Sequence, residues 1–162
     1  MSLLAGTVTI VMAGEALEVL RGLVAGAIRA PDDEPPLGAG PAELDDLQAR
    51  LGCGIPPPLR AWLSVCRGAR IGPGGLFGPR PDVPSLDMAW VRDLYPQWAE
   101  SGLLPVAGDG CGNYYVLAED GTVGFVDIMK DPDRIDRRVA GDLPSFVTRL
   151  LASDQDPGRA TS

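Results

Sequence analysis

Histidine is absent from this 162-residue chain, and basic residues are scarce. Without an imidazole there is no Ser-His-Asp triad, no Cys-His nucleophile, no histidine metal ligand and no titration switch near neutral pH. Lysine and arginine number 14 against 22 aspartates and glutamates, a formal net charge of −8. That charge opposes binding to the phosphates of nucleic acids and membranes, whereas it attracts basic proteins. We therefore expect a basic protein partner, no nucleic-acid partner and no membrane partner.

Cysteine is also rare, and none of the closely spaced pairs typical of zinc sites occurs among Cys53, Cys66 and Cys111. We expect free thiols and hence a reducing, cytoplasmic location. Residues 1–13 are apolar like a signal peptide, but they carry no Lys or Arg before the apolar run, and Glu15 and Glu18 follow closely, so secretion is the lesser alternative. No stretch reaches the roughly 20 apolar residues of a membrane span.

Glycine and proline are abundant instead, with 21 and 16 residues, and they divide the chain into short segments. The length favours one domain, which we place at residues 1–152. Residues 31–41 combine proline, glycine and acidic residues, which predicts a surface linker between the first two helices. Residues 153–162 are predicted to form a flexible tail.

Apolar residues at helical spacing predict helices at 15–29, 41–52 and 59–67. Trp62 falls on the apolar face of the third, so we assign it to the core. Ser85 is expected to cap a short helix whose apolar positions are Leu86, Trp90 and Leu94, and which Pro96 interrupts or ends.

Three strands are predicted at 103–107, 114–117 and 123–128, and a last helix begins near Asp142. Its apolar stripe runs from Leu143 to Leu151. Helices, then clustered strands, then a helix indicate an α+β fold with a mainly antiparallel central sheet flanked by helices.

No cofactor or metal site is predicted. The glycine-rich segments 72–78 and 108–112 lack the Lys and Ser/Thr of a phosphate-binding loop, so we interpret them as turns. The acidic residues between Asp127 and Asp136 offer only the first two ligand positions of a calcium loop. Asp109 and Asp127 are the only carboxylate pair that we nominate for a hydrolase, and nothing in their spacing singles them out.

Three segments follow one another in a recognisable order. Residues 43–68 combine an acidic helix ending in Leu-Gly, an aliphatic-proline step and a short helix before Gly68. Residues 104–117 form a strand, a glycine-rich turn and a strand, and residues 123–127 precede the closing helix. This order resembles the SUKH superfamily over about residues 15–151. Arg67 stands where the family usually has Asn, a surface change.

The resemblance implies an α+β fold without catalytic residues. Bacterial members of the superfamily look like immunity proteins that neutralise toxin domains, many of them nucleases, and fungal relatives regulate cell-wall synthesis. We therefore expect a non-enzymatic module that binds a basic toxin domain, as a monomer or weak homodimer. The alternatives are a regulatory or scaffold protein, a binder of a small molecule or cell-wall fragment, and the hydrolase above.

Such a module is expected to contact its partner through exposed aromatic residues rimmed by carboxylates. For each aromatic residue the alternative is core packing, and for each carboxylate it is ordinary solvated surface. The candidates are Asp87, Trp90, Asp93, Tyr95, Trp98, Glu100, Asp109, Asn113 and Tyr114.

Overall fold

The computed structural model describes residues 2–26 and 38–148, with side chains from residue 14 onward. Its helices are α1 (Ser2–Ala25), α2 (Pro41–Leu51), α3 (Pro57–Val65), the 3-10 turn η1 (Pro84–Leu86), α4 (Met88–Asp93), α5 (Pro96–Glu100) and α6 (Leu143–Phe146). Its strands are β1 (Leu104–Gly108), β2 (Tyr114–Leu117), β3 (Val123–Val126) and β4 (Arg137–Ala140).

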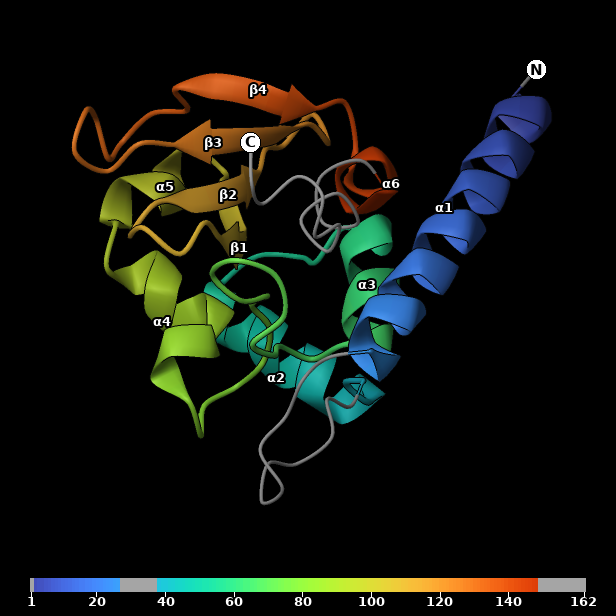
Figure 1. The fold of residues 1–162 in the computed structure, drawn as a ribbon, viewed down its shortest axis with the longest axis horizontal. Helices are drawn as coiled ribbons and strands as arrows, with labels where there is room; N and C mark the ends of the chain where they lie inside the picture. Colours follow the sequence, from blue (N-terminus) through green and yellow to red (C-terminus); the bar gives the residue numbers. More distant parts are fainter. Residues whose placement is uncertain (1, 27–37, 149–162) are drawn as a thin grey trace.

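The four strands form one antiparallel sheet in the order β1-β2-β3-β4. In Figure 1 the sheet lies at the top of the view, with α4 and α5 at one end and α1, α3 and α6 at the other. The predicted α+β fold with an antiparallel sheet flanked by helices is therefore confirmed.

Several boundaries differ from the sequence prediction. Helix α1 begins at Ser2 rather than Glu15, because residues 2–13 carry no charged side chain and so show no amphipathic period. Helix α3 begins at Pro57 rather than at Leu59, since proline suits the first helical turn. The linker residues 31–37, Leu150, Leu151 and the tail 153–162 lie outside the described residues.

The cap of α4 is the main correction. Ser85 lies inside η1, and Asp87 is the N-cap, its carboxylate accepting a hydrogen bond from the Trp90 N–H. Leu86 is buried but precedes α4, whose buried face is formed by Met88, Ala89 and Val91 instead of the predicted apolar positions Trp90 and Leu94, which are exposed. As predicted, Pro96 interrupts the helix: Tyr95 directly before it is non-helical (φ −129°, ψ 78°), so α4 ends at Asp93 and a new helix, α5, begins at Pro96.

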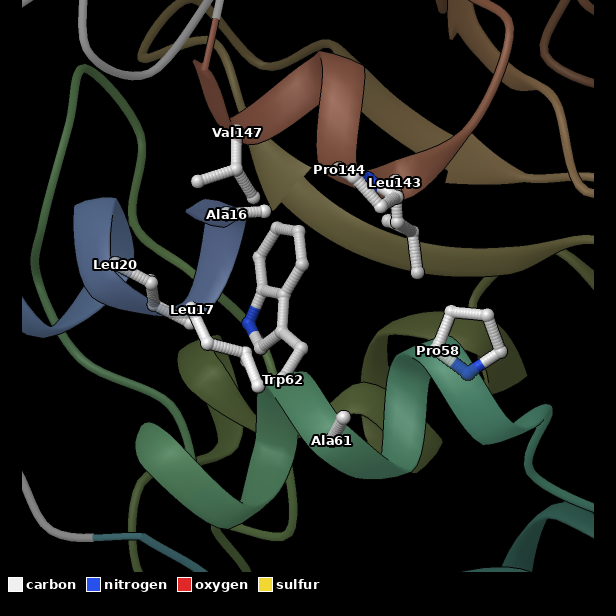
Figure 2. Close-up of a pocket in the computed structure, with 9 residues that line it drawn as sticks. All are labelled: Ala16, Leu17, Leu20, Pro58, Ala61, Trp62, Leu143, Pro144 and Val147. Atoms are coloured by element: carbon white, nitrogen blue, oxygen red, sulfur yellow. The ribbon is translucent and has the colours of Figure 1, made fainter. Parts of the chain in front are cut away.

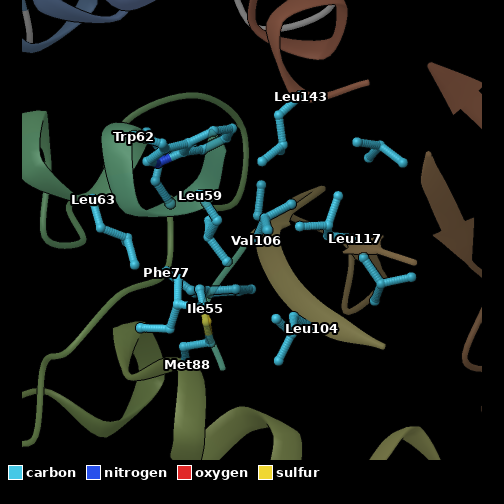
Figure 3. Packing of buried hydrophobic residues seen from close by; sticks show 14 of the residues in the cluster. Ile55, Leu59, Trp62, Leu63, Phe77, Met88, Leu104, Val106, Leu117 and Leu143 are labelled. Carbon is cyan, nitrogen blue, oxygen red and sulfur yellow. The ribbon is translucent and has the colours of Figure 1, made fainter. Parts of the chain in front are cut away.

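The core lies between α3 and the sheet. Figure 3 shows Leu59, Trp62 and Leu63 of α3 facing inward, with Val106 and Leu117 of the sheet opposite. The Trp62 ring stacks on Phe146 of α6 with centroids 6.1 Å apart. The sequence assignment of Trp62 to the core is thus confirmed, since only 2% of it is exposed.

A buried carboxylate joins α2, α4 and the segment that precedes α4. Asp87, which is 2% exposed, accepts hydrogen bonds from Arg50 Nη1 and Nη2 at 2.7 and 3.0 Å. It also accepts the N–H groups of Arg80 and Trp90 at 2.9 and 3.1 Å. A buried carboxylate is tolerated only when its lone pairs are satisfied in this way, so three distant segments depend on one side chain.

Replacing this carboxylate tests its structural role. We expect Asp87→Ala to lower the free energy of unfolding by about 2–4 kcal/mol, because the cap and the Arg50 guanidinium lose their acceptor together. Urea denaturation followed by circular dichroism measures the change. Asp46→Ala is the control, since it removes only the exposed partner of Arg50 and should cost less than about 0.5 kcal/mol.

A second test concerns a close approach of two backbone segments. A Cβ added at Gly78 would lie 2.1 Å from the Arg67 carbonyl oxygen, whereas one added at Gly54 would meet nothing within 4 Å. We expect Gly78→Ala to cost about 1–3 kcal/mol of stability. Gly54→Ala should change it by no more than about 0.5 kcal/mol. Equal midpoints of urea unfolding for the two variants would contradict the close approach.

Candidate partner-binding surface

Two of the nine candidate contact residues are buried, so the expectation that they are exposed is wrong. Asp87 is held inside by Arg50 and by the backbone of α4. Trp98 is 0% exposed, and its Nε1 donates to the carbonyl oxygen of Pro132 at 2.7 Å. Both polar groups are used internally: the carboxylate caps a helix, and the indole N–H binds a loop.

The buried Trp98 belongs to an aromatic cluster with two further candidates, Tyr95 at the start of α5 and Tyr114 at the start of β2. The ring of Tyr95 stacks on Trp98 at 4.4 Å and meets Tyr114 edge-on at 5.6 Å, and Trp98 meets Tyr114 at 5.5 Å. Two more candidates, Asp109 and Asn113, belong to the turn between β1 and β2. Both are half-buried, as are Tyr95 and Tyr114. Half-buried rings that pack on one another favour the core-packing alternative for Tyr95 and Tyr114, and the role of the five residues in partner contact stays a prediction.

Asp109 organises the β1–β2 turn. Its Oδ1 accepts the N–H groups of Cys111 and Asn113, and its Oδ2 accepts from Asn113 Nδ2 at 3.0 Å. Burial alone would raise the pKa of Asp109, but these hydrogen bonds outweigh it and hold the pKa below its ordinary value. Asp109 therefore lacks the raised pKa of a general acid. The Asp127 carboxylate accepts N–H groups of its own turn, from Met129 and Lys130.

The remaining candidates lie on exposed helical surface. Trp90 is 46% exposed, Asp93 at the end of α4 is exposed, and Glu100 on α5 is exposed and accepts from Gln97 Nε2. The neighbouring Leu94 is 48% exposed, and the sequence analysis does not identify it as a surface residue. The signal that could have found it is the alternative apolar face of Met88, Ala89 and Val91, which is buried and lies opposite positions 90 and 94.

A charged cavity of about 260 Å³ lies at the loop of Lys130, Arg134 and Asp136, and an apolar groove lies between α1, α3 and α6. Figure 2 shows it lined by Leu17 and Leu20 of α1, Pro58 and Trp62 of α3, and Pro144 of α6. Its cavity measures about 20 Å³, far below the roughly 300–1,000 Å³ of typical ligand pockets. The Trp62 N–H has no hydrogen-bond partner among the described residues. The groove therefore does not support the small-molecule alternative.

In the part of the chain that the structure describes, no three Cys, Asp or Glu residues lie close enough to hold a metal ion. None of the helices described there combines the length and apolar character needed to cross a membrane.

The tyrosine cluster generates a titration test. Burial raises the pKa of Tyr114 to about 12, helped by its hydrogen bond with Tyr95 and by the negative charge of Asp109. Because the unfolded chain ionises near the ordinary value of about 10, this tyrosine stabilises the fold below that pH and loses its contribution as the pH rises toward 12. An ultraviolet titration should show one late phenolic transition that Tyr114→Phe removes. A late transition unchanged in this variant would contradict the assignment.

Comparison with known protein families places this geometry in context. Residues 38–149 match the SMI1/KNR4 family (SUKH-1), a range that includes α2, the sheet, α6 and all nine candidate residues. A search of the curated proteins finds no match. The family match covers more than half of the chain, and it confirms the resemblance drawn from the order of its motifs. The chain therefore belongs to the SMI1/KNR4 family, SUKH-1.

Proposed function

We propose that the chain is a non-catalytic protein-binding module that neutralises a basic toxin domain, with a nuclease domain as the expected class. Membership of a generally non-enzymatic family supports the first part of this proposal. The charge of −8 and the arrangement of charges on the surface support the second.

The observation that carries the proposal is an excess of unpaired surface carboxylates. Many of the cations are neutralised within the chain: Arg67 pairs with Glu43 at 3.2 Å, Arg80 with Asp82 at 3.1 Å and Lys130 with Asp136 at 2.7 Å. By contrast, six exposed acidic residues form no ion pair with any described residue, against two exposed arginines, Arg70 and Arg138. The six are Glu15, Asp93, Glu100, Glu119, Asp120 and Asp133. The surface charge available to a partner is therefore predominantly negative.

Such a surface suits a partner that binds nucleic acid. A nuclease presents lysines and arginines to phosphates, so an acidic protein is drawn to the same residues and covers them. Long-range attraction of this kind accelerates association and weakens as salt screens it. Neutralisation then requires only that the complex block access to the substrate, and no reaction is needed.

The test is co-expression with a toxin, which we expect to be encoded by a gene next to that of this chain. We expect the chain to restore growth of cells that produce this toxin, and calorimetry to show a direct complex whose Kd rises with salt concentration. A catalytically inactive toxin variant should still bind, which separates binding from protection. Failure to restore growth together with no detectable complex would overturn the proposal.

A further inference from the structure

We propose that the partner docks on the α4 face, defined as Trp90, Asp93 and Leu94, and that this face fits a basic protein surface carrying an apolar pocket beside a lysine or arginine. The inference rests on the proposed function and adds to it the place of contact and the chemistry of the partner's side. It is carried by the exposure, charge and rigidity of this one short helix.

Two large apolar side chains stand on one side of α4. Trp90 and Leu94 are four positions apart, and Leu94 keeps helical dihedral angles (φ −67°, ψ −23°), so both project from the same helix face. Their exposed fractions are 46% and 48%. A half-exposed tryptophan beside a half-exposed leucine provides the kind of anchor that dominates binding energy when a partner desolvates it.

The charge beside these anchors is negative. Asp93, exposed, lies between them in the chain and forms no ion pair with a described residue. The nearby cations face other groups: Arg50 binds Asp87 and Asp46, and Arg92 is 7% exposed with its Nη1 3.3 Å from the Cys53 sulfur. The α4 face thus presents apolar surface and one free carboxylate, which is complementary to a pocket flanked by positive charge.

Both ends of the helix are fixed. At its start, Asp87 caps the Trp90 N–H while Arg50 holds the same carboxylate. After its end, the Tyr95 ring stacks on buried Trp98. An anchor on a helix fixed in this way loses little conformational freedom on binding, so more of its contact energy appears as affinity.

The experiment measures the Kd of the toxin domain for single variants of the whole chain. We expect Trp90→Ala to raise the Kd about 30-fold or more, and Leu94→Ala about 5-fold. Trp90→Phe should recover part of the loss. Met129→Ala is the matched control: Met129 is 94% exposed on a loop outside the α4 face, and its removal should change the Kd less than about twofold.

A second arm tests the charge. Asp93→Asn should lower the association rate about threefold and reduce its dependence on salt, while Asp133→Asn, an exposed carboxylate elsewhere, should leave both unchanged. Urea unfolding of each variant establishes that the fold is kept, and Trp90→Phe provides a second, milder variant should Trp90→Ala unfold.

The outcomes separate the two proposals. Wild-type binding that survives every α4 variant would overturn the docking site and leave the proposed function standing. Loss of binding confined to Met129→Ala or Asp133→Asn would also overturn it, and would move the contact to another surface. Absence of any complex with the wild-type chain would overturn the proposed function itself, and the docking site with it.

Discussion

The buried carboxylate of Asp87 is the interaction on which this structure depends most. Burying a charge is costly unless every lone pair finds a donor, and here the donors come from α2, from the segment before η1 and from α4 itself. The arrangement fixes where α4 starts and holds that end of the helix in place. Met88, Ala89 and Val91 form the buried side of α4, so Trp90 and Leu94 lie on the opposite, exposed side.

Much of the fold follows from periodicity, and what does not follow has identifiable physical causes. The apolar stripes of α2 and α3 and the apolar runs of β1 to β3 are visible in the sequence, because burial selects their residue types. Strand β4 is not visible: Arg137 and Arg138 are exposed and only Ala140 is fully buried, so no apolar alternation marks it. Only its antiparallel pairing with β3 in the folded chain identifies this segment as a strand.

The candidate surface was predictable in part, and polar groups account for the difference. Residue type cannot tell a solvated aspartate from one that caps a helix, so Asp87 and Asp93 look alike in the sequence although only the second is exposed. Trp90 and Trp98 likewise differ only in their neighbours, since Trp98 has a carbonyl within reach of its N–H. The acidic character of the surface, in contrast, depends on composition and could be predicted directly.

The order of the sheet leaves two edges, and the chain treats them differently. The outer side of β1 is covered by the segment of Leu76 and Phe77, where Leu76 bridges to Ala107 and the Phe77 N–H donates to the carbonyl oxygen of Val106. The outer side of β4 has no neighbouring strand among the described residues, but it carries the two exposed arginines. Charged side chains on an edge strand oppose pairing with a strand of another molecule. Arg137 and Arg138, which give β4 no apolar alternation in the sequence, thus protect the folded protein against edge-to-edge aggregation.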